Sequence, residues 1–344
     1  MREDNHKVKI SFPVFLMGTI ALTLIFVAIV LSFFPTPEQA PDYHLMSRSH
    51  IPSDTIDWVK PDISSLGNSE NDKQIKYGRD LIANTASYLR PNGSVKHISN
   101  GMNCQNCHLD AGTKFLGNNY SAVASTYPKY RERSGTTESI YKRVNDCLER
   151  SLNGTALDTN SAEMQAIKAY ILWLGKDVPK GKKIRGVGIA ELPYLNRMAD
   201  TVNGKSVFEH KCQSCHKSDG DGSLNASING YIYPPLWGEH SYNIGAGLYR
   251  LSRLAGYVKY NMPFGIDYSD PLLSNADAWD VAAYIDSRPR PTKDLSKDWP
   301  KISGKPVDNP LGPYADTFSE AEHKYGPFGP IVMYKNDHPD KKSK

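Results

Sequence analysis

The pentapeptide C-x-x-C-H occurs twice in this chain, and it constrains what the chain can fold into more than any other feature. In this pattern the two thiols form thioethers with the vinyl groups of a haem, and the following histidine ligates the iron. A zinc ribbon also uses C-x-x-C, but its second pair would follow after about 15–20 residues. The two copies here lie much further apart, so the sequence predicts two covalently bound haem c groups. The copies consist of Cys104, Cys107 and His108, and of Cys212, Cys215 and His216.

Length and composition indicate a globular protein with two domains and extensions. The chain has 344 residues, too many for one small cytochrome domain, and 39% of them are hydrophobic and 23% charged. The net charge of +4 is small and no basic stripe with interleaved aromatic residues occurs, so we expect no nucleic-acid partner. Four of the five cysteines belong to the haem signals, which leaves Cys147 without a disulfide partner.

The N-terminus predicts a membrane anchor. Residues 1–9 are polar and basic, and residues 10–34 are almost wholly apolar. A helix of about 25 residues is about 37 Å long, which is enough to cross a bilayer. A cleaved signal with a soluble periplasmic form is the alternative, but its apolar region would be shorter and Ala40 lies in a poor cleavage context. Because the basic residues precede the helix, we expect residues 1–9 in the cytoplasm and the rest at the periplasmic face of the bacterial inner membrane.

Helical periodicity around each haem signal predicts an all-α fold with two tandem cytochrome c-like domains. In each half a helix precedes the signal and a closing helix with an aromatic face follows it, around Tyr170 and around Tyr284. The predicted helices cover residues 71–88, 139–152, 164–174, 205–210, 248–261 and 276–286. The predicted division of the chain is a linker over 35–70, a first cytochrome c domain over 71–180, a linker over 181–203 and a second cytochrome c domain over 204–292.

The remaining segment, residues 293–344, carries no haem signal and little periodicity. Proline cannot donate a backbone hydrogen bond and favours extended backbone, so a proline-rich stretch argues against long helices. We therefore expect an extended C-terminal tail that packs on the surface. Its prolines include Pro300, Pro306, Pro310, Pro313, Pro327 and Pro330.

A second axial ligand decides what each haem iron does, and Met262 is the candidate for the second haem. It follows His216 at a separation typical of cytochromes c, and Pro263 comes directly after it. A core methionine is the alternative interpretation. His/Met ligation raises the reduction potential and suits electron transfer. The second haem is thus predicted to be ligated by His216 and Met262.

The first half has no Met-Pro pair, and Met164, on a closing helix, is expected in the core. Its candidate ligand is Cys147, which shares a helical stripe at i, i+4 and i+8 with Arg143 and Ser151. A small buried thiol is the alternative. Cations favour the thiolate, which is both an iron ligand and a nucleophile, and arginine grips oxyanions through paired hydrogen bonds. Other cations close in sequence are Arg131, Arg133, Lys142 and Arg150, of which Arg150, with neighbouring Glu149, is expected to face solvent.

Several segments resemble the dihaem thiosulfate dehydrogenases. The most specific is N-D-C-L-E-R-S-L-N-G around Cys147, because the haem signals alone are generic. The resemblance covers about residues 70–335. Other similar segments are Y-G-R at 77–79, C-Q-N-C-H-L-D-A-G at 104–112, Y-P-P-L-W-G at 233–238, N-M-P at 261–263 and H-K-Y-G-P-F at 323–328.

The resemblance implies His/Cys ligation of an active-site haem and His/Met ligation of the other. It also implies an enzyme that joins two thiosulfates into tetrathionate, or runs the reverse, and exchanges electrons with a c-type cytochrome. Cys147 would be the iron ligand and reactive sulfur, and Arg143, Arg133 and Ser151 would hold the sulfonate oxygens. Some members have a lysine before the methionine where this chain has Asn261, so simple His/Met ligation is expected here.

Three other functions remain open from the sequence. A membrane-anchored dihaem electron carrier would explain both haem signals and Met262 but would leave Cys147 and its arginines without a role. A haem subunit of a multi-protein sulfur-oxidising complex would also use a cysteine-ligated haem, but it would need a partner for activity. A dihaem peroxidase is a third possibility, which peroxide turnover would reveal.

Overall fold

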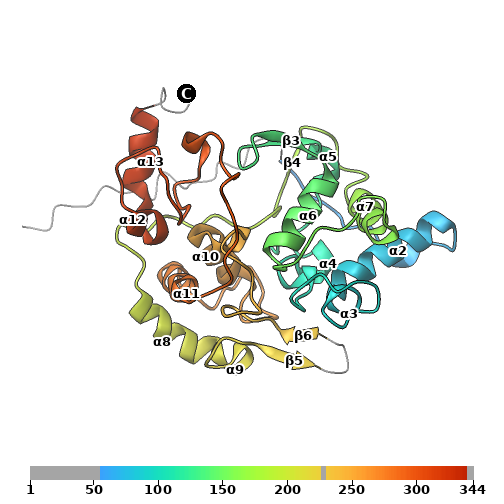
Figure 1. Cartoon of the computed structure of the whole chain (residues 1–344), viewed down its shortest axis with the longest axis horizontal. Coiled ribbons are helices and arrows are strands. Elements are labelled where there is room, and N and C mark those ends of the chain that lie inside the picture. The colour runs from blue at the N-terminus through green and yellow to red at the C-terminus, as the bar shows by residue number, and fades with distance from the viewer. Residues whose placement is uncertain (1–54, 226–229, 339–344) are drawn as a thin grey trace, which may run out of the picture. The chain divides into compact units, whose positions relative to one another are not determined.

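The computed structural model describes residues 55–225 and 230–338 (Figure 1). The predicted cytoplasmic N-terminus over 1–9, the anchor over 10–34 and the alternative cleavage site lie outside the described residues. Among the residues that the structure does describe, no helix is long and apolar enough to cross a membrane.

The first helical unit surrounds the first C-x-x-C-H signal. Its two long helices, α2 and α7, pack against each other, and their buried faces share a core with Met164, as the sequence predicts. The signal itself begins with a single 3-10 turn, and α6 follows a short hairpin. The elements are α2 (Glu70–Ala83), α3 (Thr85–Leu89), η3 (Cys104–Asn106), α4 (Leu109–Gly112), α5 (Val123–Thr126), α6 (Ile140–Arg150) and α7 (Ala162–Leu174).

The second unit repeats this plan around the second signal. A helix leads directly into the signal, and it packs against a closing helix that also contacts the helix before Met262. Phe208, Trp237 and Trp279 are buried in the core that these helices share. The elements are α8 (Thr201–Lys211), α9 (Gln213–His216), η5 (Gly247–Tyr249), α10 (Leu251–Asn261) and α11 (Asn275–Ser287).

Strands contribute little to the fold, in agreement with a predominantly helical class. The described residues contain three two-stranded ladders, each of two to four residues per strand. One of them is parallel and joins the two segments that the sequence presents as linkers. The ladders are β1 (Thr55–Ile56) with β4 (Lys183–Ile184), β2 (Lys129–Arg131) with β3 (Thr136–Glu138), and β5 (Ser223–Asn225) with β6 (Gly230–Tyr233).

The C-terminal segment differs from the extended tail expected from its prolines. It is irregular up to residue 319 apart from one 3-10 turn, η6 (Ile302–Gly304), and then forms α12 (Glu320–Tyr325) and α13 (Phe328–Asp337). Pro327 precedes α13 and Pro330 lies in its first turn, where no intrahelical N–H bond is lost. Phe328 and Ile331 are buried in the second core. The expectation of an extended tail is therefore wrong for residues 320–337.

The same glycine contact brings the long helices together in both units. A Cβ on Gly78 would lie 1.9 Å from the carbonyl oxygen of Ala166 and 2.9 Å from Cβ of Tyr170. A Cβ on Gly204 would lie 1.9 Å from the carbonyl oxygen of Asp280, and again 2.9 Å from Cβ of the aromatic residue four positions later. The two halves therefore share one packing rule, in which a glycine allows the closing helix to approach.

We expect Gly204→Ala to lower the stability of the second domain. The new methyl group cannot avoid backbone atoms, so α8 and α11 must separate, and such overpacking costs about 1–3 kcal/mol. Denaturant unfolding of the haem-loaded protein, followed by far-UV circular dichroism, measures the effect. Gly247→Ala is the control, because a Cβ there meets nothing within 4 Å. Equal stability of both variants would contradict this packing rule.

Candidate haem and thiol sites

The imidazole of His108 is held by one backbone carbonyl. Its Nδ1 donates to the carbonyl oxygen of Asn118 at 2.6 Å, which leaves Nε2 as the nitrogen with a free lone pair. The pKa of His108 is lowered to about 4, mainly by burial and also by the nearby Arg143, against the effect of the Asn118 carbonyl. The ring of Tyr120 lies 4.5 Å away, centroid to centroid. The result is a neutral, oriented imidazole, which is the form that ligates iron.

The cysteines of the first signal are poor candidates for thiolates. The pKa of Cys104 is raised to about 11 and that of Cys107 to about 12, in both cases mainly by burial and also by the neighbouring Cys147. Zinc binding and thiol exchange require the thiolate, so these environments do not favour either use of C-x-x-C. None of the five cysteines forms a disulfide. Both thiols are thus available for thioether attachment.

Cys147 faces the first signal from α6, as its influence on both cysteines indicates. The helix starts at Ser139, whose hydroxyl accepts a hydrogen bond from the N–H of Lys142. Arg143 lies one turn before Cys147, and the cysteine is the main reason why the pKa of Arg143 is above its ordinary value, against the opposing effect of burial. Ser151 caps the helix, and its N–H donates to the carbonyl oxygen of Cys147 at 2.8 Å. The predicted stripe is therefore one helix face that carries a thiol and a guanidinium close together.

Arg133 does not lie on the helix face that carries Cys147 and Arg143. It lies in the turn between β2 and β3, and its Nη1 donates to the carbonyl oxygen of Gly245 at 2.9 Å. Its Nε is 3.9 Å from Asp298, and its guanidinium lies 5.6 Å from the centroid of Trp299. The pKa of Arg133 is lowered to about 10, mainly by burial and also by Arg150 and Arg143, whereas Asp298 opposes these effects. Arg133 is thus close enough to feel the charge of Arg143, but its side chain already interacts with Gly245, Asp298 and Trp299.

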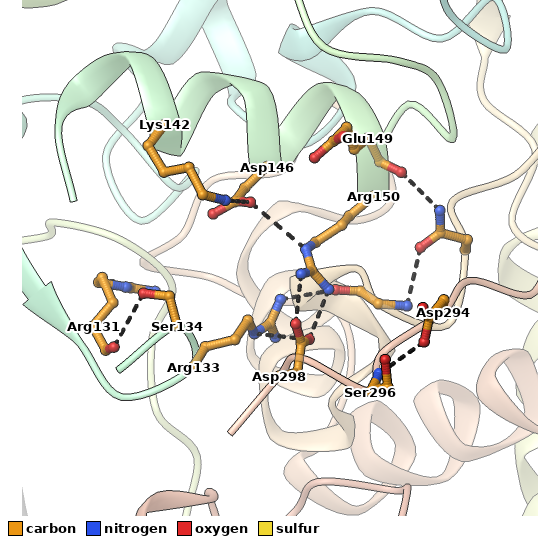
Figure 2. A network of polar contacts seen from close by, with 12 residues as sticks. Arg131, Arg133, Ser134, Lys142, Asp146, Glu149, Arg150, Asp294, Ser296 and Asp298 are labelled. Atoms are coloured by element: carbon orange, nitrogen blue, oxygen red, sulfur yellow. Dashed lines mark hydrogen bonds and ion pairs between the residues drawn. The ribbon is translucent and has the colours of Figure 1, made fainter. Parts of the chain in front are cut away.

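The burial of Arg150 differs from the solvent-facing position that the sequence predicts. Its side chain is only 11% exposed. Its Nη1 and Nη2 donate to the two carboxylate oxygens of Asp298, at 2.8 and 2.7 Å (Figure 2). The carbonyl oxygens of Arg150 and Glu149 also accept hydrogen bonds from Asn243. Sequence reasoning missed Asp298 altogether, because it lies 148 positions after Arg150 in a segment without a motif.

In the second signal, as in the first, a backbone carbonyl orients the histidine. His216 is buried, and its Nδ1 donates to the carbonyl oxygen of Pro234 at 2.8 Å. Burial lowers the pKa of His216 and raises that of Cys212 to about 12. A cavity of about 390 Å³ lies against these residues, and Met262 is in its wall. The other members of the wall are mainly apolar and include Leu236, Leu254, Val258, Val281 and Ile285.

The two signals lie against one another. Cys107 lines the same cavity as the residues of the second signal. The hydroxyl of Tyr257 on α10 donates to the carbonyl oxygen of Asn106, at 2.7 Å. Asn261, next to Met262, donates through Nδ2 to the carbonyl oxygen of Leu116 at 3.1 Å. These bonds fix the loop of the first histidine to the helix that leads to the second candidate axial ligand.

Taken together, these residues fit two haems c. Each signal offers two thiols and a neutral histidine whose Nε2 is free of the backbone bond, and the second signal adds an apolar cavity with a thioether in its wall. The histidines donate to the backbone carbonyls of Asn118 and Pro234. No sequence motif marks these carbonyls, since every residue has one. The sequence predicted the side chains, and the structure adds the groups that orient them.

Comparison with family models divides the chain in the same way. Residues 94–179 match the cytochrome c domain of the SoxA/TsdA type. Residues 201–289 match the general cytochrome c family. The chain thus contains two cytochrome c domains in tandem.

Several characterised proteins are similar to most of the chain. It is 37% identical to the thiosulfate dehydrogenase of Psychrobacter arcticus, over 70% of this chain and 71% of that protein. It is 36% identical to that of Allochromatium vinosum, over 69% and 86%. Its structure is similar to thiosulfate dehydrogenase TsdBA of Marichromatium purpuratum, with a TM-score of 0.63 and 28% identity, and covers about half of that longer chain (51%) and 72% of its own length. On the identity and coverage of these relatives, the chain belongs to the thiosulfate dehydrogenase family.

Proposed function

We propose that this chain is a dihaem oxidoreductase that interconverts two thiosulfates and one tetrathionate and exchanges two electrons with a c-type cytochrome. The family relationship and the two cytochrome c domains support this activity. One observation carries it further: the thiol of Cys147 and the guanidinium of Arg143 face the first haem signal from one helix. A reactive sulfur next to a fixed cation suits a substrate that is both a sulfur nucleophile and a dianion.

Each haem would be held by its own set of residues. Cys104 and Cys107 would attach the first haem covalently, and His108, through Nε2, and Cys147 would ligate its iron. Cys212 and Cys215 would attach the second haem, and His216 and Met262 would ligate its iron. When bound, each haem takes up one electron, which matches the two electrons that thiosulfate coupling releases.

In the oxidative direction Cys147, once released from the iron, would form a sulfur–sulfur bond between its thiolate and the outer sulfur of a first thiosulfate, and the two electrons given up would go to the two haems, one to each. A second thiosulfate then attacks the substrate sulfur of this adduct, which forms tetrathionate and returns the Cys147 thiolate. Arg143 holds the sulfonate oxygens and lowers the repulsion between the dianions. Ser151 and Arg133 complete the anion site. Arg133 contributes its positive charge from its position beside Asp298.

The alternatives explain less of the site. A non-catalytic electron carrier needs the two haems and Met262 but not the thiol beside Arg143. The relatives that match most of the chain are named as dehydrogenases, which does not favour a subunit that depends on a partner. We place the chain at the periplasmic face of the inner membrane through residues 10–34, because haem c attachment takes place in that compartment and these residues are apolar.

The full-length, haem-loaded protein is expected to reduce ferricyanide when thiosulfate is added. Two thiosulfates should disappear for each tetrathionate formed, because the coupling releases two electrons. Ion chromatography of both anions measures this ratio. Intact haem spectra with neither thiosulfate oxidation nor tetrathionate reduction would instead support an electron carrier.

Cys147→Ala should lower turnover by about a thousandfold or more, since both the adduct and the thiolate are lost. Both haems should remain attached, because thioether attachment uses other cysteines. The pyridine haemochrome assay counts the haems, and the ferricyanide assay gives turnover. Cys147→Ser keeps the size and offers a hydroxyl in place of the thiol, and it should be equally inactive. Turnover within a factor of two of the wild type would refute the role of the thiol.

Arg143→Ala should lower kcat/KM for thiosulfate by about 10- to 100-fold, since a charge-assisted hydrogen bond contributes about 1.5–3 kcal/mol. Arg143→Lys should recover only part of this loss, because lysine keeps the charge but not the paired geometry. Steady-state kinetics at fixed ionic strength measure both. Lys142→Ala is the matched control, as it removes the neighbouring cation, whose side chain is 51% exposed. An equal effect of both alanine variants would indicate general electrostatics instead of a specific anion contact.

A further inference from the structure

A second cavity, of about 550 Å³, lies where the C-terminal segment meets both cytochrome c domains. Its wall is built from Arg133 in the turn between β2 and β3, from residues of the stretch 244–250 that leads into α10, and from residues of the segment 293–313. It shares no lining residue with the cavity beside the second haem signal. Its volume lies within the range of about 300–1,000 Å³ that is usual for small-molecule sites.

The wall of this cavity is positively charged. Its described cations are Arg133, Arg250, Lys293 and Lys305, and its one described carboxylate is that of Asp298. Both oxygens of that carboxylate already accept hydrogen bonds from a guanidinium outside the wall, that of Arg150 (Figure 2). A hollow surface of one sign concentrates ions of the opposite sign. The cavity is therefore suited to an anion.

Three of these cations keep a donor for a ligand. Arg133 uses Nη1 for the carbonyl oxygen of Gly245, and Arg250 uses Nε and Nη2 for Asp308. The described residues leave Nη2 of Arg133 and Nη1 of Arg250 without a hydrogen bond, and the two side chains are 19% and 21% exposed, so they reach open space. Lys293 is half-buried and has no hydrogen-bond or ion-pair partner in the described chain. Guanidinium and ammonium donors of this kind match the oxygens of an oxyanion.

The shape of the cavity is fixed by bonds within its own wall. Nζ of Lys305 donates to the carbonyl oxygens of Leu311 and Pro313, both at 2.9 Å. The N–H of Trp299 donates to the carbonyl oxygen of Arg133 at 2.7 Å, and the guanidinium of Arg133 lies 5.6 Å from the indole centroid. Trp299 has a φ of 60°, which is strained for a large side chain, and such strain is concentrated at ligand sites. The wall is thus held in one arrangement before a ligand enters.

Arg133 connects this cavity to Cys147. It lines the cavity, and Arg143 is one of the charges that influence it. Arg143 is in turn influenced most by Cys147. The coupling of two thiosulfates brings two dianions together, and like charges repel strongly where little water screens them. Arg143 beside the thiol serves the first dianion, so the second needs cations of its own within reach of the adduct.

We propose that this cavity binds the second thiosulfate, with Arg250 and Lys293 on its sulfonate and Arg133 between the two substrates. The inference rests on the proposed function and assigns to the cavity the step that resolves the adduct. The outer sulfur of the second thiosulfate forms a bond to the substrate sulfur of the adduct. The bond from that sulfur to Cys147 breaks, its electron pair returns to Cys147 as the thiolate, and no proton moves. In the reverse direction the cavity holds one sulfonate of tetrathionate.

Lys293→Gln in the full-length, haem-loaded protein should separate the two halves of the reaction. Haem reduction by thiosulfate, followed by rapid mixing, should keep its wild-type rate, since the first thiosulfate binds beside Arg143. Tetrathionate formation at low thiosulfate should fall by about three- to tenfold, because a charged contact is lost at a partly exposed position. Ion chromatography measures the tetrathionate.

Lys297→Gln is the matched control for this variant. Lys297 lies on the same segment, and both lysines lower the pKa of Asp294, but Lys297 is exposed and does not line the cavity. Equal rates of tetrathionate formation in the two variants would overturn the proposal. A parallel loss of haem reduction and tetrathionate formation in Lys293→Gln would also overturn it, because the residue would then serve the first thiosulfate.

The number of bound thiosulfates gives a second test that needs no turnover. Haem-loaded Cys147→Ala keeps both anion sites but cannot form the adduct, so isothermal titration calorimetry should count two thiosulfates per protein. In the double variant Cys147→Ala/Lys293→Gln one of the two sites should weaken by about three- to tenfold and the other should be unchanged. A single site in both proteins would overturn the proposal. Failure of the proposed function would appear separately, as absence of turnover in the wild type.

Discussion

Each haem signal of this protein depends on one hydrogen bond from a histidine to a backbone carbonyl. Nδ1 of His108 donates to Asn118, and Nδ1 of His216 donates to Pro234. Each bond selects the tautomer that leaves Nε2 free for iron and fixes the plane of the ring. Both accepting carbonyls belong to loops, so the rest of each domain must hold a loop in place. The glycine-mediated helix pairs, at Gly78 and at Gly204, give each domain the rigid frame that does so.

The positive charges around Cys147 are balanced by a carboxylate, Asp298, that lies outside the first cytochrome c domain. Arg143, Arg150 and Arg250 each lower the pKa of Arg133, so several positive charges lie close together before an anionic substrate binds. Asp298, in the C-terminal segment, pairs with Arg150 and lies beside Arg133 (Figure 2). Cys147 is the largest influence on the pKa of Arg143, which places this guanidinium close to the thiol. The C-terminal segment therefore contributes to the proposed anion site, although it carries no haem signal.

The two domains divide the work of the proposed enzyme, and the structure connects them directly. Tyr257 and Asn261 on α10 donate to carbonyl oxygens in the loops of the first signal. Met262 follows immediately, so the position of this candidate ligand of the second haem depends on the first domain. A pair of haem sites that share one cavity wall suits a reaction that releases two electrons at one place.

The sequence by itself determined what depends on residue type and spacing. It predicted both haem signals, the helical class, the long helices around them, the core position of Met164 and the stripe that contains Cys147 and Arg143, since each follows from a local pattern. It could not predict that Arg150 is buried against Asp298 or that residues 320–337 are helical. These features depend on contacts between segments far apart in the chain, where burial changes the environment of a charge and packing overrides the preference of prolines. Only the tertiary structure decides such contacts, because no local pattern encodes which distant segment will be present.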